Sequence, residues 1–109
     1  MLPQKFIDWV ESSGLGDGCL ELSAHDDEVV IEGFLVPLDQ RRSGVGTAIL
    51  TALCRKADDD GIILAVSPEP VRIMISDPIP RKVLEAFYAK HGFIPGADGV
   101  WRRYPPGFS

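Results

Sequence analysis

Residues 40–47, Gln-Arg-Arg-Ser-Gly-Val-Gly-Thr, are the stretch on which the fold of this 109-residue chain depends. Before them, residues 29–36 (VVIEGFLV) are rich in β-branched and aromatic side chains, which is typical of a strand. After them, residues 44–60 (GVGTAILTALCRKADDD) repeat an apolar side chain every four positions, which predicts an amphipathic helix. The stretch therefore joins a strand to the start of a long helix.

Two glycines and two arginines give this junction its chemistry. Gly44 and Gly46 carry no Cβ, so a ligand can approach the backbone closely. Amides at the start of a helix are unpaired, and the helix dipole there attracts anions. Arg41 and Arg42 add positive charge to an otherwise acidic chain. The pattern predicts a phosphate or pyrophosphate cradle, although a tight turn with solvated arginines accounts for the same residues.

The remaining segments predict one mixed α/β domain around a single sheet. The other expected elements are a helix over 2–11, strands over 19–24 and 62–66, a helix over 80–91, and a hairpin of 93–94 with 100–104. The strand over 19–24 is expected to pair antiparallel with 29–36, and Gly33 hints at a bulge or a close backbone approach. The strand, helix, strand order makes 29–36 and 62–66 roughly parallel neighbours.

Composition narrows the class of protein. The chain has 45% hydrophobic residues, 11 Lys and Arg, and 16 Asp and Glu, giving a net charge of −5. This balance favours a basic partner and argues against direct nucleic-acid binding. No apolar run reaches the roughly 18 to 20 residues that span a bilayer. Cys19 and Cys54, without an apolar leader, suggest reduced thiols in the cytoplasm, and no Cys and His spacing suggests a metal.

Two separated motifs carry a resemblance to the GNAT superfamily of acetyl-CoA-dependent N-acetyltransferases. Arg41-x-x-Gly44-x-Gly46 matches its Gln/Arg-x-x-Gly-x-Gly/Ala motif, and residues 87–93 (FYAKHGF) resemble its (Leu/Phe)-Tyr-x-x-x-Gly-Phe signature. The likeness covers about 29–104. It implies a single GNAT-like domain over 1–109, with a reduced N-terminal part at 1–28 and a coenzyme-binding and catalytic core at 29–104. The implied sheet is mostly antiparallel, with one splayed parallel pair, flanked by three helices.

The resemblance also implies a set of contacts to acetyl-CoA, with no metal. Backbone groups of the splayed strand hold the pantetheine arm, and amides at the helix start hold the pyrophosphate. Arg81 stands seven residues before Tyr88, where the family often has Asn, and a cation there suits the coenzyme phosphates. The implied coenzyme-binding residues are Phe34, Leu35, Val36, Arg41, Arg42, Ser43, Gly44, Val45, Gly46, Thr47 and Arg81.

The resemblance makes Tyr88 the candidate general acid, because a phenol is protonated at neutral pH and can give its proton to a thiolate. A helix aromatic packed on the sheet is the alternative. Glu32 is the candidate base, and strict alternation places it on the same strand face as Val30 and Phe34. A solvated strand carboxylate is its alternative. His25 and His91 are weaker candidates for the base.

The expected acceptor is a primary amine, such as a lysine on a basic protein site. The N-terminal region is shorter than in a standard member and resembles small phage-type members of the superfamily, which suggests an open acceptor side. A non-catalytic acidic module, for example a phage antagonist of host defence that has kept or lost coenzyme A, is the alternative. Residues 100–104 could pair two copies into a homodimer, and the Asp58–Asp60 run suggests a solvated helix end.

Overall fold

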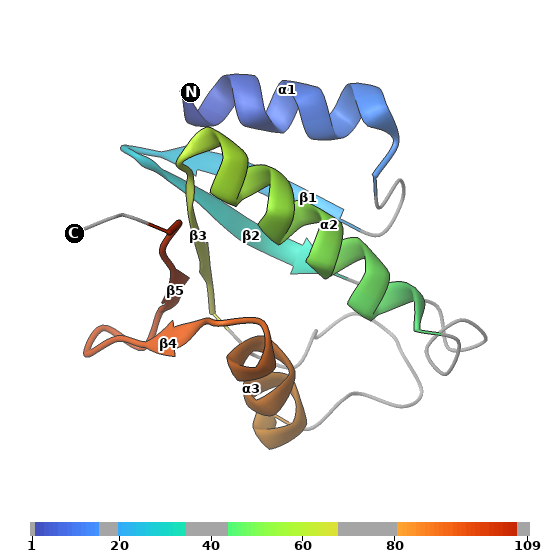
Figure 1. Cartoon of the computed structure of the whole chain (residues 1–109). Coiled ribbons are helices and arrows are strands. Elements are labelled where there is room, and N and C mark those ends of the chain that lie inside the picture. The colour runs from blue at the N-terminus through green and yellow to red at the C-terminus, as the bar shows by residue number, and fades with distance from the viewer. Residues whose placement is uncertain (1, 16–19, 35–43, 68–80, 107–109) are drawn as a thin grey trace.

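The computed structural model of the chain describes residues 2–15, 20–34, 44–67 and 81–106 (Figure 1). The first and last residues of each helix and strand lie within two residues of the bounds predicted from the sequence. In chain order the elements are α1 (Pro3–Ser13), β1 (Leu20–His25), β2 (Glu28–Phe34), α2 (Val45–Asp60), β3 (Ile63–Val66), α3 (Arg81–Lys90), β4 (Ile94–Pro95) and β5 (Trp101–Arg103).

The strands form one mixed sheet in the order β1-β2-β3-β5-β4. β2 and β3 run parallel, whereas the β1–β2, β3–β5 and β4–β5 pairs are antiparallel. The predicted sheet, mostly antiparallel with one parallel pair, is confirmed. No helix in the described ranges is long and apolar enough to cross a membrane.

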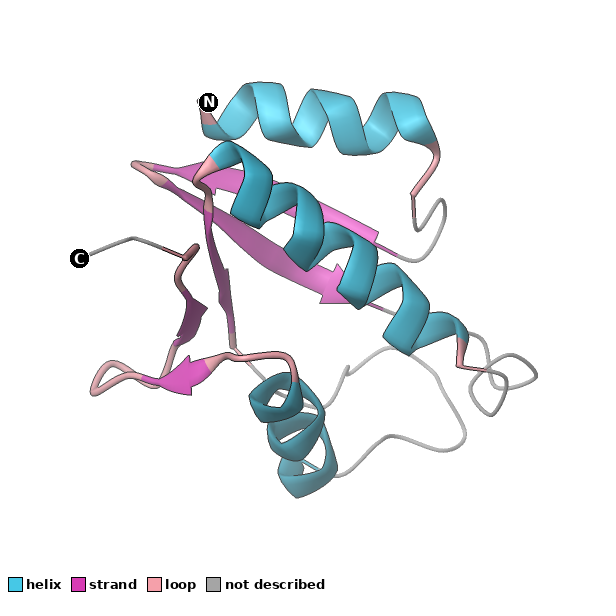
Figure 2. Cartoon of the chain, viewed as in Figure 1, coloured by secondary structure: helices cyan, strands magenta, loops and turns pink. Residues whose placement is uncertain are grey.

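One face of the sheet, called the core face below, packs against α1 and α2. Figure 2 shows both helices on the same side of the β1–β2 hairpin. Phe6 of α1 and Leu53 of α2 are fully buried against Val29 of β2 and Leu64 of β3. α1 begins with a proline in its first turn and ends at Gly14, whose φ of 75° few other residues adopt readily. The opposite side of the sheet is called the outer face.

A β-bulge interrupts the β1–β2 ladder and corrects one prediction. Glu21 pairs with Gly33 and Leu22 pairs with Ile31, so Glu32 is the extra residue. The predicted irregularity near Gly33 is therefore confirmed. Because the extra residue shifts the alternation, Phe34 packs on the core face. Glu32 contacts Ser23 on the outer face, so the prediction that Glu32 and Phe34 share a face is wrong.

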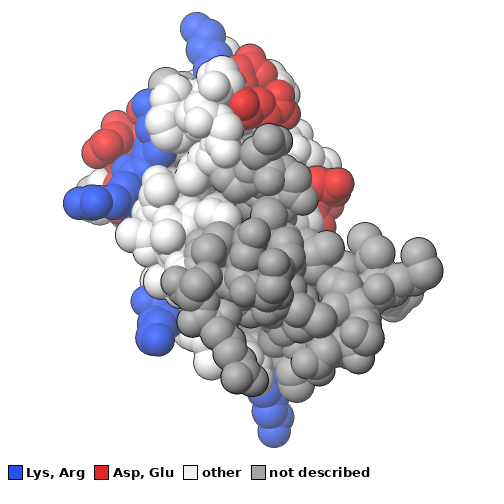
Figure 3. Space-filling model, turned by 90° about the vertical axis from the view of Figure 1, so that its right-hand side faces the viewer, with Lys and Arg blue, Asp and Glu red and all other residues white. Residues whose placement is uncertain are grey.

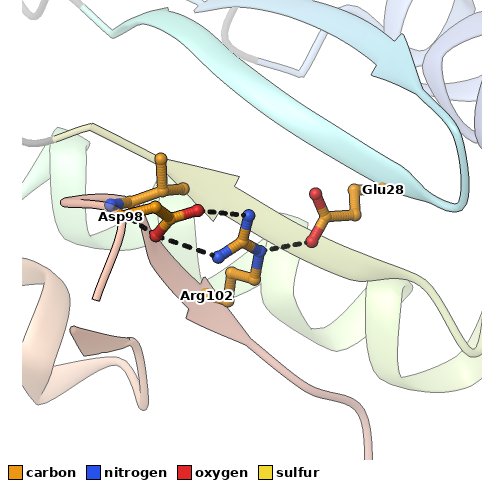
Figure 4. Close-up of polar contacts among 4 residues, drawn as sticks. Glu28, Asp98 and Arg102 are labelled. Atoms are coloured by element: carbon orange, nitrogen blue, oxygen red, sulfur yellow. Dashed lines mark hydrogen bonds and ion pairs between the residues drawn. The ribbon is translucent and has the colours of Figure 1, made fainter. Parts of the chain in front are cut away.

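Arg102 of β5 ties three parts of the outer face together (Figure 4). Its guanidinium donates two hydrogen bonds to Asp98 in the β4–β5 turn, at 3.0 and 3.3 Å, and a third to Glu28 of β2. The strand β3 lies between β2 and β5. Arg102 therefore clamps the closing hairpin to β2 across an intervening strand.

The Asp58–Asp60 run is more structural than the sequence suggested. Asp58 accepts two hydrogen bonds from the Arg103 guanidinium, and Asp60 lies 3.2 Å from the Lys56 ammonium. Arg103 faces α2 while its neighbour Arg102 faces the opposite side, as strand alternation requires. The interpretation of this run as only a solvated helix end is corrected, because Arg103 of β5 reaches Asp58 and Lys56 of the same helix reaches Asp60.

Replacing Arg102 should test the clamp. Arg102→Met removes three charged hydrogen bonds and leaves the half-buried Glu28 carboxylate unpaired, so unfolding should become easier by about 1–2 kcal/mol. Arg102→Lys keeps the charge but cannot bind Asp98 through two parallel hydrogen bonds, and its loss should be intermediate. Urea unfolding measures both changes. A wild-type midpoint for Arg102→Met would contradict the structural role.

Candidate functional site

The parallel pair opens into a fork at its carboxyl end. β2 and β3 pair from Glu28 with Ile63 up to Ile31 with Val66, where β3 ends. β2 continues to Phe34 and pairs only with β1 there. On the side of residues 32–34 away from β1, no described strand is adjacent, and Figure 1 shows the two strands diverging. This fork is the splayed parallel pair of the predicted fold.

A chain of aromatic side chains lies on the core face beside the fork. The ring centroid of Phe34 is 6.3 Å from that of Phe87, which is 5.5 Å from that of Tyr88. Phe93 follows, with its centroid 5.3 Å from that of Tyr88. Edge-to-face and tilted geometries of this kind pack aromatic rings favourably. These ring contacts therefore connect the end of β2, through Phe87, to Tyr88.

Tyr88 is buried at 5% exposure, and burial raises its pKa to about 12. Burial disfavours the charged phenolate, so the phenol keeps its proton throughout the physiological range. No described residue accepts or donates a hydrogen bond at its hydroxyl. A buried aromatic and a proton donor are both consistent with this position, so packing and acid catalysis do not exclude one another.

Glu32 lies on the outer face at the same fork. Its Oε1 accepts a hydrogen bond from Ser23 Oγ at 2.6 Å and lies 3.6 Å from His25 Nε2. Ser23 is not among the predicted site residues, although the alternation of a hairpin with a short turn places Ser23 and Glu32 on one face. Glu32 and Tyr88 do not share a face of the sheet. Glu32 lies on the outer face and Tyr88 lies in the core, on opposite sides of the fork.

The start of α2 has the features of an anion site. Gly44 precedes the helix with a φ of 81°, which favours glycine, and its carbonyl accepts the first helical hydrogen bond from Ala48 at 2.9 Å. No side chain caps the helix, and no acidic residue lies in its first turn. Gly46 is half-buried and Thr47 is exposed. The first-turn amides therefore have no described side-chain acceptor.

Several of the predicted coenzyme-binding residues lie outside the described ranges. The residues that lie outside the described ranges are Leu35, Val36, Arg41, Arg42 and Ser43, and the side chain of Val45 is not described either. Arg81 is exposed at the first residue of α3, and its Nε lies 3.3 Å from Glu85 Oε2. Its contact with a coenzyme phosphate stays a prediction.

Two further groups have structural roles. Cys54 is a buried free thiol, as predicted, and burial raises its pKa to about 11. His91 lies 2.9 Å from the Phe87 carbonyl through Nδ1 and 3.5 Å from Thr51 Oγ1 through Nε2, so it joins α3 to α2. Within the described ranges, no three metal-ligating side chains gather.

Figure 3 shows the face of the molecule at the right-hand side of Figure 1, where α2 begins. On its described part, acidic and basic side chains are interspersed. The net negative charge of the chain is thus not concentrated there into one continuous acidic patch.

Comparison with known proteins identifies the fold. No protein-family model and no curated protein matches the chain. It is similar to the solved structure of the anti-CRISPR protein AcrVA5, with a TM-score of 0.56 and 23% identity, over 76% of this chain and 85% of that one. It is also similar to the ribosomal-protein-S18-alanine N-acetyltransferase from Escherichia coli, with a TM-score of 0.58 and 20% identity. That match covers 83% of this chain and 62% of the acetyltransferase, less than two thirds of its length. The chain has a GNAT-like fold.

The raised pKa of Tyr88 predicts a specific loss of stability in alkali. The folded-state value of about 12 exceeds the ordinary 10.0, so this contribution is complete below pH 10 and is lost as the pH rises through 12. Tyr88→Phe should flatten the fall in unfolding free energy over that window by about 2–3 kcal/mol. The raised pKa of Cys54 also lowers the free energy of unfolding in alkali, but it does so equally in the wild type and in Tyr88→Phe and therefore cancels in the comparison. Urea unfolding across the pH range measures the difference, and parallel curves would contradict it.

Proposed function

We propose that this protein is an N-acetyltransferase that moves the acetyl group of acetyl-CoA to a primary amine at the fork. One observation carries the proposal: the end of β2 pairs with β1 but no longer with β3, and it has a buried phenol on one side of the sheet and an exposed carboxylate on the other. The similarity of the fold to an N-acetyltransferase supports the same chemistry. The finer assignments below rest on the two sequence motifs together with this geometry.

The chain offers the coenzyme two kinds of contact. The free backbone edge at Phe34 suits the amide-bearing pantetheine arm, which would add to β2 as a short strand, and Leu35 and Val36 are proposed to contact the same arm. Beyond it, amides at Gly44, Gly46 and neighbouring positions suit a pyrophosphate. Arg41, Arg42, Ser43, Val45, Thr47 and Arg81 complete the proposed set. A backbone N–H near residues 35–36 would stabilise the thioester oxygen as it becomes negative.

Tyr88 is proposed to protonate the leaving thiolate. A phenol with a pKa of about 12 is a weak acid in water, but a thiolate buried nearby is also a strong base. Burial raises the pKa of a thiol as it raises that of a phenol, so a buried thiolate can take the phenol proton. Glu32 is proposed as the base that removes a proton from the incoming ammonium.

The proposed acceptor is a lysine or another amine on a basic protein site, because the chain is acidic overall and Glu32 is exposed on the outer face. No direct nucleic-acid partner is proposed, and the proposed compartment is the cytoplasm. A homodimer stays a prediction. β5 has β3 on one side and β4 on the other, so strand pairing between copies needs another edge.

A second candidate function is a non-catalytic, acidic protein-binding module that antagonises a host defence, as a phage-type protein would. The similarity to a protein named as anti-CRISPR supports it. Calorimetry with acetyl-CoA and a thiol-release assay separate the two candidates. Coenzyme binding without turnover on any amine favours the module.

The Tyr88 hydroxyl should matter for turnover and not for coenzyme binding. With acetyl-CoA and a basic lysine-containing peptide or spermidine as acceptor, Tyr88→Phe should lower kcat about 100-fold. The affinity for acetyl-CoA should stay unchanged, because only a proton donor is removed. Release of free thiol measures kcat, and calorimetry measures the affinity. Equal kcat values for the two proteins would remove Tyr88 from the mechanism.

A negative charge at Gly44 should weaken coenzyme binding. Gly44→Glu places a carboxylate beside the amides proposed to hold the pyrophosphate, so acetyl-CoA should bind at least about tenfold more weakly than to Gly44→Gln. Gly44→Gln is the matched control, since both side chains have the same size and meet the same strain at a φ of 81°. Equal affinities, measured by calorimetry, would refute this loop as the phosphate site.

A further inference from the structure

We propose that His25 is a proton-relay residue, which accepts the proton that Glu32 removes from the acceptor ammonium and passes it to solvent. Ser23 is the positioning residue that orients Glu32 for this exchange. The inference rests on the proposed acetyl transfer, and it extends that function by assigning roles to two residues of β1.

The geometry separates the two oxygens of the Glu32 carboxylate. Oε1 accepts a hydrogen bond from Ser23 Oγ at 2.6 Å and lies 3.6 Å from His25 Nε2. Oε2 has no partner among the described residues. One oxygen is therefore held toward β1 and the imidazole, while the other remains available to an incoming N–H group.

The bulge places this carboxylate at the fork. Glu32 is the unpaired extra residue of β2, and it comes directly after Ile31, the last residue that pairs with β3. Bulges re-aim side chains and end strand pairing in this way. An amine that approaches over the outer face meets Glu32 next to the position proposed for the thioester.

Exposure supplies a path for the proton toward water. The side chain of Glu32 is 49% exposed and that of His25 is 63% exposed. Imidazole is the side chain suited to taking and releasing protons near neutral pH, whereas a carboxylate alone holds a proton poorly there. An exposed ring can turn through the short distance to Oε1 and back to solvent at little cost.

The charged side chains near Glu32 and His25 also favour an ammonium substrate. On the outer face of the same hairpin, Glu21 lies opposite Gly33, and the Glu28 carboxylate contacts Arg102. The Arg102 guanidinium is occupied by Glu28 and Asp98, so little positive charge is left to repel a cation. β3 contributes the apolar residues Ile63 and Ala65 to this face. This acidic balance favours a cationic substrate at the outer face.

The protons balance over one turnover. Glu32 takes one proton from R–NH3⁺, and neutral His25 takes it from the carboxylic acid and releases it to water. The free amine then forms the C–N bond as the C–S bond of the thioester breaks, and the thiolate takes the Tyr88 proton. The proton lost by the acylated nitrogen restores Tyr88. The sum is R–NH3⁺ and acetyl-CoA giving the amide, free coenzyme A and one proton.

Chemical rescue tests the relay. With acetyl-CoA and the lysine-containing peptide or spermidine, His25→Asn should lower kcat/KM about tenfold or more, and added imidazole should restore much of the loss. Imidazole should leave the wild type unchanged. The control is Asp59→Asn, an exposed residue near the C-terminal end of α2, which should keep wild-type rates with and without imidazole. In a Glu32→Gln background, His25→Asn should add no further loss.

The outcomes separate the two proposals. If the wild type releases thiol but His25→Asn matches it, or loses activity that imidazole does not restore, the relay is overturned and the acetyltransferase stands. If the wild type releases no thiol with any amine tested, both are overturned. Ser23→Ala should lower kcat with little change in KM, and Ser23→Thr, which keeps the hydroxyl, should recover it. Equal rates for Ser23→Ala and wild type would remove the positioning role.

Discussion

The parallel pairing of β2 with β3 is the constraint on which the candidate site depends. Parallel neighbours need a crossover connection, and α2 lies in that connection. The start of α2 therefore lies toward the same end of the sheet as the carboxyl end of β2 (Figure 1). Ligands in α/β sheets commonly bind outside the carboxyl ends of the strands, where diverging strands leave a crevice. One pairing thus places an open backbone edge and the start of α2 toward the same end of the sheet.

The bulge at Glu32 divides this end of the sheet into two chemical sides. A regular strand would place Phe34 and Glu32 on one face, with an aromatic ring in solvent or a carboxylate in the core. The extra residue sends Phe34 inward to Phe87 and leaves Glu32 outward with Ser23. A reaction at the fork would meet a protonated phenol from one side and an accessible carboxylate from the other.

Neighbouring arginines of β5 hold the two faces to the rest of the molecule. Arg103 reaches Asp58 of α2 on the core side, and Arg102 reaches Glu28 of β2 on the outer side. Because β4 and β5 are short, the closing hairpin has few backbone hydrogen bonds of its own. The two guanidinium groups compensate for that, and they join the hairpin to strand β2 and helix α2, which border the fork.

The sequence by itself determined the elements, their order and the two motifs, because helical and strand periodicity, glycine positions and motif spacing are all local properties. It also located Tyr88 on a helix and Gly44 at a helix start. Only the tertiary structure decided that Phe34 faces the core, that Ser23 holds Glu32, and that Asp58 has a partner. The physical reason is distance along the chain: Arg102 and Glu28 are 74 residues apart, and Arg103 and Asp58 are 45 apart. Such pairs, and the single-residue shift of a bulge, arise from how strands align and not from any local pattern.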